Sequence, residues 1–368
     1  MKLSTRPLQN FLRTFCLLCL SVTFTQPSPI RAANPALQPC TPSAALADIP
    51  VPLATVSALP TISPDLYIVT TVAPITNIVS NIGGTRVQVH GLIPEGADSH
   101  TFEPKPSAVE IITKADVVFL NGLHLEEPTR KLAVPNLKPG ALLVELGTTT
   151  LRQEDWLFDF SFPVEKGDPN PHLWMNPLLT DGYAALIRDT LSKVDPPDAA
   201  YYQANYAAFS SRLTLLDQAI CNAVATIPIG QRKLLTYHDS FAYFAPRYNM
   251  TVIGAIQPAD FAEPSVQEVA HLIDQIRTEK VPAIFGSEVF PSKVIEQIGK
   301  ETGVRYIDTL ADDDLPNQTG DRTYHSYLQL MINDATTLTS ALGGDPSALR
   351  AVPTANLHGV DSNVMATP

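Results

Sequence analysis

Short apolar runs alternate with segments of helical spacing through most of the chain after its first 65 residues. The strands predicted in the first half are residues 66–71, 86–93 and 117–120. Pro74 opens a helical pattern with apolar side chains at i, i+3, i+4 and i+7, and Ser107-x-x-Glu110 is a capping-box signature for a second helix. This order of strands and helices predicts a parallel sheet with helices on its faces.

The second half of the chain repeats the alternation, without a detectable residue-level repeat. Its predicted strands are residues 233–237, 251–256, 282–285 and 304–307. A second capping box, Ser265-x-x-Glu268, precedes a helix of clear apolar periodicity, and two further helices are predicted at residues 292–302 and 323–342. The second half therefore predicts another parallel sheet covered by helices.

One long helical stretch, residues 197–226, joins the two halves and has no internal Gly or Pro. At 1.5 Å per residue it would be ~45 Å long, enough to extend along two lobes. We therefore predict an α/β fold of two lobes, each with a parallel sheet flanked by helices. One long connecting helix would join the lobes, and a metal site would lie in the cleft between them.

The two ends of the chain lack these patterns. Lys2, Arg6 and Arg13 precede an apolar run too short for a permanent membrane span, which indicates an export signal and a periplasmic protein. The predicted organisation is a signal peptide at 1–33 with an unassigned cleavage point, a Pro/Ala/Ser-rich linker at 34–65, an N-terminal α/β lobe at 66–196, the connecting helix at 197–228, a C-terminal α/β lobe at 229–342 and a disordered tail at 343–368.

Composition and cysteine usage refine this picture. The 368 residues are 45% hydrophobic and 17% charged, which is typical of a soluble globular protein with room for two domains. The formal net charge of −12 argues against a nucleic-acid partner and is compatible with attracting cations. Cys16 and Cys19 lie in the leader. An exported protein could pair Cys40 with Cys221, but the linker position of Cys40 disfavours the bridge, and neither cysteine has the small-residue context of a lipid-attachment site.

Four potential metal ligands stand where apolar runs give way to turns, with consecutive members roughly 70 residues apart. They are His100, His172, His238 and Asp308. Because ligands of open α/β sheets lie outside the carboxyl ends of the strands, we expect these side chains to face one crevice, two from each half. Imidazole nitrogen and carboxylate oxygen suit divalent zinc or manganese. Four protein ligands would hold a metal and leave little room for a reacting water.

A single histidine at a turn is more often a cap or a surface residue than a ligand. The histidines that fit this simpler interpretation are His90, His271, His325 and His358. His124 also follows a strand, and we interpret it as a loop residue near the cleft. Asn121 and Asp239 are candidates for orienting the ligands, although either could cap a turn.

Several stretches resemble the receptors of zinc and manganese ABC importers, the cluster A-I solute-binding proteins of the ZnuA/TroA-like family. The resemblance extends from about Leu66 to Leu342, and its most specific stretches are residues 96–107, 121–123, 171–177, 236–244, 262–265 and 307–310. It implies a monomeric metal receptor without catalytic residues, served by permease and ATPase subunits on separate chains. By this resemblance the ligands again fall on His100, His172, His238 and Asp308.

Ligand type favours zinc, because three imidazoles and one carboxylate match its near-tetrahedral preference, whereas manganese tolerates more oxygen. The chain departs from the family pattern in two places, of which the first weakens the zinc assignment and the second concerns the loop before His172. Residues 148–170 contain no histidine, although many zinc members carry a His-rich loop there, and Asp168-Pro-Asn-Pro-His172 stands where the family often has Asp-Pro-His. We expect high-affinity capture of zinc and delivery to an ABC permease, with manganese or iron as alternatives.

Two functions of other classes stay open, an exported zinc hydrolase and a surface adhesin. A hydrolase needs an open coordination position and a general base. Glu288 is the plausible nearby carboxylate, and we interpret it as a cleft residue. The chain has no H-E-x-x-H, G-x-S-x-G or P-loop motif. Some members of the family are described as adhesins, and nothing in the sequence separates that role from metal capture.

Overall fold

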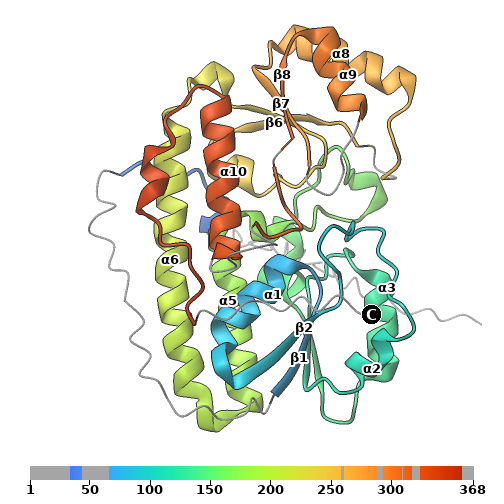
Figure 1. Cartoon of the computed structure of the whole chain (residues 1–368), viewed down its shortest axis with the longest axis vertical. Coiled ribbons are helices and arrows are strands. Elements are labelled where there is room, and N and C mark those ends of the chain that lie inside the picture. The colour runs from blue at the N-terminus through green and yellow to red at the C-terminus, as the bar shows by residue number, and fades with distance from the viewer. Residues whose placement is uncertain are drawn as a thin grey trace, which may run out of the picture. The chain divides into compact units, whose positions relative to one another are not determined.

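Two parallel sheets of four strands organise the protein (Figure 1). The computed structural model describes residues 34–43, 66–257, 261–287, 293–308, 310–316 and 324–358. The first sheet has the order β2-β1-β3-β4, with β1 (Leu66–Thr70), β2 (Val87–Gly91), β3 (Val117–Leu120) and β4 (Leu142–Glu145). The second has the order β6-β5-β7-β8, with β5 (Lys233–Thr236), β6 (Thr251–Ala255), β7 (Ala283–Phe285) and β8 (Arg305–Ile307). All observed pairings are parallel, and the predicted α/β class is confirmed.

Helices connect and cover the strands of each sheet. Those of the first half are α1 (Ala73–Gly83), α2 (Ala108–Ile112), α3 (Glu127–Asn136), α4 (Leu146–Thr150) and α5 (Pro177–Val194). Those of the second half are α7 (Phe244–Arg247), α8 (Val266–Glu279), α9 (Lys293–Thr302) and α10 (Tyr327–Ala341). None of the helices in the described residues is long and apolar enough to cross a membrane.

The long connecting helix predicted between the halves is α6 (Ala199–Ala225). It packs against α1, α5 and α10, and in Figure 1 both sheets lie on the same side of it. Its buried side chains include Phe209, Leu213 and Leu216, which belong to a hydrophobic cluster that also takes in Ile68 of the first sheet and Phe285 of the second. One continuous core therefore ties both lobes to the same helix.

The two capping-box signatures have different outcomes. Ser265 and Glu268 form the reciprocal pair of hydrogen bonds at the start of α8, as predicted. Ser107 makes no such bond, because its backbone is already helical (φ −62°, ψ −22°) and an N-cap needs non-helical dihedral angles. The sequence signature is thus wrong for α2, a helix of only five residues.

Residues 34–43 do not behave as the linker predicted from their composition. They form a 3-10 turn, η1 (Pro35–Leu37), and a disulfide joins Cys40 to Cys221 of α6. The backbone amide of Cys40 also donates to the carbonyl of Arg247. The expectation that the cysteines stay unpaired is therefore wrong, since backbone contacts hold the segment against the core. Residues 44–65 and the predicted signal peptide at 1–33 lie outside the described residues.

The tail predicted to be disordered from residue 343 is folded as far as residue 358. A 3-10 helix, η10 (Pro346–Ala351), packs against α6 and α10, with Leu349 and Val352 buried. Two apolar side chains suffice to dock the segment, and its Pro- and Ala-rich composition conceals them. Residues 359–368 lie outside the described part of the chain.

Candidate metal site

Three of the four predicted ligands come together between the two lobes. His100 lies on the loop that follows β2, and His238 lies two residues beyond β5. His172 immediately precedes η6 (Leu173–Met175), which leads into α5. Asn176 caps that helix by accepting from the amide of Leu178, which fixes where the segment carrying His172 turns.

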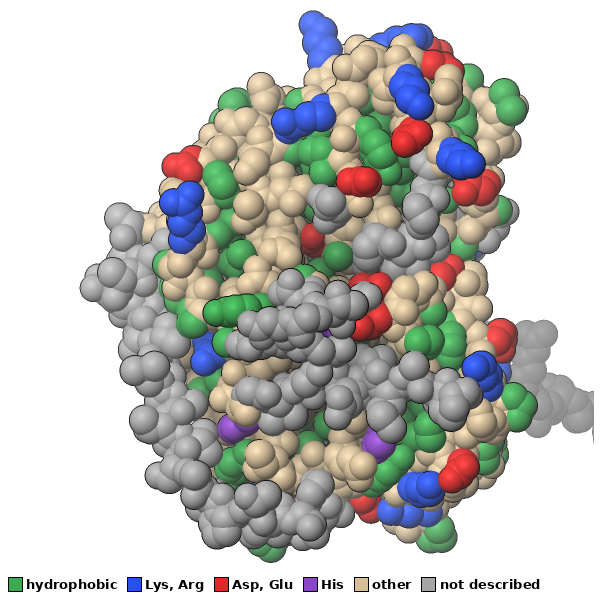
Figure 2. All heavy atoms as spheres, in the orientation of Figure 1, with side chains coloured by type: hydrophobic (Ala, Val, Ile, Leu, Met, Phe, Trp, Pro, Cys, Tyr) green, Lys and Arg blue, Asp and Glu red, His purple; other side chains and the backbone are tan. Residues whose placement is uncertain are grey.

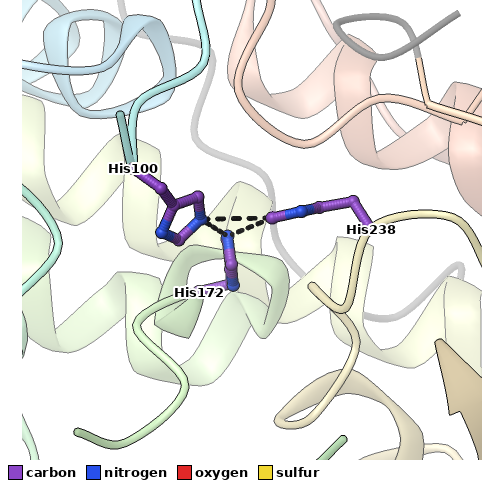
Figure 3. Close-up of side chains that lie close together, drawn as sticks. All are labelled: His100, His172 and His238. Atoms are coloured by element: carbon purple, nitrogen blue, oxygen red, sulfur yellow. Dashed lines mark hydrogen bonds between the residues drawn. The ribbon is translucent and has the colours of Figure 1, made fainter. Parts of the chain in front are cut away.

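The three imidazoles point their Nε2 atoms at a common centre (Figure 3). The Nε2 of His100 lies 3.1 Å from that of His172 and 3.2 Å from that of His238, and the remaining pair is 3.0 Å apart. His172 and His238 are buried and His100 is partly buried. These three form a group of potential ligand atoms within 4.8 Å of one another among the described residues.

Burial favours the neutral form of the His100 and His172 imidazoles. Loss of solvent lowers the pKa of His100 well below its usual value, and the neighbouring His238 adds to the effect. The pKa of His172 is lowered in the same way, first by burial and then by His238 and His100. Neutral imidazole is the form that coordinates a metal, so burial favours the binding-competent form of His100 and His172.

The structure does not bring Asp308 into the group. Asp308 is exposed and directly follows β8, which is the edge strand two positions away from β5. At a strand spacing of roughly 4.8 Å, a residue at the end of β8 starts about 10 Å from the end of β5. The chain returns toward the histidines four residues later, and Oδ2 of Asp312 lies 3.4 Å from Nε2 of His238 and 3.9 Å from Nε2 of His172. The carboxylate beside the histidines is therefore that of Asp312.

Each of the two buried histidines has an amide oxygen at its other ring nitrogen. Oδ1 of Asn170 lies 2.8 Å from Nδ1 of His172, and Oε1 of Gln257 lies 2.7 Å from Nδ1 of His238. Neither residue was predicted from the sequence to contact a ligand. Asn170 stood out only as a departure from the family pattern, and Gln257 lies 19 residues from His238. The one available signal for Gln257 was its position just beyond β6, beside the central strand β5.

Asn121 and Asp239, the residues predicted to orient the ligands, form hydrogen bonds to backbone groups near the histidines. Nδ2 of Asn121 donates to the carbonyl of Pro171, which precedes His172. Oδ2 of Asp239 accepts from the amides of Phe160 and Ser161. Burial and the adjacent carboxylate of Asp239 raise the pKa of Asp159 to about 9, so this pair holds one proton at neutral pH.

The loop that carries His100 is fastened to the segment that carries Asp312. The amide of Gly96 donates to the carboxylate of Asp314 at 2.8 Å, and the amide of Ser99 donates to Asp313 at 3.3 Å. Close by, Nε2 of His325 lies 2.9 Å from Oε1 of Glu95. His325 is fully buried just before α10, which corrects its interpretation as a cap or surface residue.

Aromatic rings and a cavity border the group. Phe261 stacks on His100 with ring centroids 4.6 Å apart, and Trp174 packs edge-on against His172. A cavity of about 180 Å³ reaches His100, and His124 also lines it, as its interpretation as a loop residue near the cleft requires. Glu288, the candidate base of a hydrolase, lies outside the described residues.

Comparison with known proteins agrees with this architecture. The family model described as "Zinc-uptake complex component A periplasmic" matches residues 68–341. The chain belongs to this family. The predicted resemblance is thereby confirmed, and so is the expectation that the protein is a receptor and not an enzyme.

Individual members of the family differ in the metal that they are named for. The iron-binding protein YfeA of Yersinia pestis is 30% identical over 272 residues, 72% of this chain and 84% of that protein. The manganese ABC transporter substrate-binding lipoprotein PsaA of Streptococcus pneumoniae is 25% identical and covers 73% and 86%. The periplasmic zinc-binding protein TroA of Treponema pallidum superposes with a TM-score of 0.68 at 26% identity, covering 75% and 99%.

Proposed function

We propose that this protein captures zinc outside the cytoplasmic membrane and delivers it to an ABC permease. The observation that carries the proposal is the convergence of three Nε2 atoms at 3.0–3.2 Å. His172 and His238 both face amide oxygens through Nδ1, so their Nε2 atoms present lone pairs to each other. Lone pairs at this distance repel unless a cation lies between them, which is what a bound metal supplies.

The ligand set that we propose is His100, His172, His238 and Asp312. Zinc–nitrogen bonds of about 2.0–2.1 Å in a tetrahedron place the nitrogens about 3.3 Å apart. The observed nitrogens are within a few tenths of an ångström of that spacing. Asp312 supplies the carboxylate in place of the predicted Asp308, since its oxygen lies beside two of the imidazoles.

Zinc is preferred to manganese and iron because of the ligand chemistry and not because of the relatives, which are named for all three metals. Three neutral imidazoles suit zinc, whereas the harder manganese ion favours oxygen ligands. Four protein ligands also argue against a zinc hydrolase, which keeps one coordination position open for water. An adhesin role has no residue in its support beyond membership of the family.

The proposed setting is the periplasm, with the permease and ATPase as separate chains and the receptor as a monomer. The disulfide between Cys40 and Cys221 fits an oxidising compartment and leaves no thiol at Cys40 for a lipid. On the face in Figure 2, positive and negative side chains of the described residues are interspersed.

Metal titration of two aspartate variants tests the site. Asp312→Ala is expected to weaken zinc binding by at least tenfold, because it removes the charged ligand, whereas Asp308→Ala is the matched control and should bind as the wild type does. The wild-type apo-protein should bind zinc more tightly than manganese. The reverse result for the two aspartates would show that the ligand is Asp308, and a wild-type protein that binds neither metal would refute the function.

A further inference from the structure

We infer that two neutral amides, Asn170 and Gln257, are positioning residues that fix the tautomers of His172 and His238. The inference rests on the proposed function and deepens it at the same site. An amide oxygen accepts a hydrogen bond and cannot donate one, so the Nδ1 atom of each histidine must carry the proton. Both Nε2 atoms are then free of hydrogen and directed at the metal position.

The orientation of the Asn170 amide follows from its other partners. Its Oδ1 also accepts from the backbone amide of His172 at 3.0 Å. Its Nδ2 donates to Oδ2 of Asp159 at 2.7 Å and to the carbonyl of Asp239 at 2.6 Å. Exchanging oxygen and nitrogen would set donor against donor and acceptor against acceptor, so the assignment is fixed by the network.

The same residues connect the two histidines across the lobes. Asn170 belongs to the segment that carries His172, and the carbonyl it binds is that of Asp239, the residue after His238. On the other side, Oγ of Ser161 donates to the backbone carbonyl of Gln257 at 2.9 Å. We term residues 159–161 together with Asn170 the brace. Within it, Asn170 binds Nδ1 of His172, and Ser161 binds Gln257, the residue that faces Nδ1 of His238.

Residues 148–170, which include the brace, contain no histidine, so this stretch offers no imidazole of its own to a metal. Because the acceptors at Nδ1 are amides and not carboxylates, they orient the rings without adding negative charge behind them. A carboxylate there would make each imidazole a stronger donor, so neutral acceptors favour release of the metal to the permease.

Substitution of Gln257 tests the role in two ways. Gln257→Leu removes the acceptor at similar size, and we expect zinc affinity to fall about 10- to 100-fold, as is usual when a residue that orients a ligand is lost. In ¹⁵N-labelled apo-protein, long-range ¹H–¹⁵N spectra should show His238 protonated on Nδ1 in the wild type and a mixture of tautomers in the variant. Gln257→Glu restores an acceptor, so it should restore the Nδ1–H tautomer and transfer zinc to a chelator more slowly than the wild type.

Gln275→Leu is the matched control, because Gln275 is likewise a glutamine whose side-chain amide is hydrogen-bonded, in its case from α8 to the backbone carbonyl of Ile253. It should leave both affinity and tautomer unchanged. Asn170→Leu provides a second variant, expected to alter the His172 tautomer. Wild-type His238 protonated on Nε2, or unchanged zinc affinity in Gln257→Leu, would overturn the inference. The tautomer spectra need no metal, so they decide the positioning role even if the wild-type protein binds neither zinc nor manganese.

Discussion

Removal of the disulfide between Cys40 and Cys221 is expected to lower the free energy of unfolding by several kcal/mol. The two cysteines are 181 residues apart in the sequence. In the chain-entropy description, closing a loop of that length restricts the unfolded chain by about 5 kcal/mol at 25 °C, and losses measured for native disulfides are about 2–5 kcal/mol. We therefore expect a loss in that range, among the largest that two substitutions remote from the metal site would produce.

Hydrogen bonds should keep the N-terminal segment docked once the disulfide is gone. Nδ2 of Asn176 donates to the carbonyl of Ala36 at 2.8 Å, and Nη1 of Arg247 donates to that of Gln38 at 2.9 Å. The loss should therefore arise mainly in the unfolded state, with the folded structure retained.

Urea unfolding of the mature protein, with and without dithiothreitol, measures the effect. The free energy of unfolding of the oxidised wild-type protein should exceed that of the reduced wild-type protein by about 2–5 kcal/mol. Cys40→Ala/Cys221→Ala should match the reduced wild type and should not respond to the reductant, which makes it the control for other actions of dithiothreitol. Equal stability of oxidised and reduced wild type, or two free thiols in protein isolated from an oxidising compartment, would refute the reasoning.

Three further predictions concern pH, the site and the lobes. Burial raises the pKa of Glu126 from 4.5 to about 7, so the folded protein holds a proton that the unfolded chain loses. This group alone should lower the free energy of unfolding by about 3 kcal/mol between pH 4.5 and 8, and in urea titrations the fall in Glu126→Gln should be smaller than that of the wild type by this amount. Trp174→Phe removes the hydrogen bond from Nε1 to the carbonyl of Asp312 and should weaken zinc binding about tenfold by calorimetry, whereas unchanged affinity would exclude this support. Small-angle scattering should give nearly the same radius of gyration with and without zinc, because one continuous core ties both lobes to α6. A large compaction on zinc binding would contradict this expectation.

The two sheets are predictable from sequence because their central strands, β1, β3, β5 and β7, carry short apolar runs that are largely buried. All four residues of β3 are buried, and the run predicted at 117–120 coincides with that strand. β4 was not predicted, since its four residues are only partly buried and it pairs with β3 alone at the sheet edge. Segments that dock through a few contacts, such as residues 34–43 and η10, leave no periodic signal.

The histidines of the site are predictable for a different reason. His100 and His238 follow strands that belong to parallel sheets, and the carboxyl ends of such strands converge on a ligand. The same rule selected Asp308, but it does not state how far the chain travels before it returns, so it does not indicate that the carboxylate of Asp312 lies beside the histidines. Asn170 and Gln257 depend on hydrogen bonds between loops, which no local pattern encodes.

The arrangement of the lobes accounts for how the three Nε2 atoms stay close together. A continuous core along α6 fixes the lobes, and the hydrogen bonds of Gly96 and Ser99 join the loop of His100 to the segment of Asp312. Behind the imidazoles, the brace holds the rings of His172 and His238. The free energy of folding, and not that of metal binding, therefore offsets the repulsion between the converging imidazole nitrogens. Little of the metal-binding free energy is then spent on closing the lobes. A receptor built in this way would discriminate among metals by the chemistry and spacing of its ligands, and a partner that separated the loops held together by folding would speed the release of its cargo.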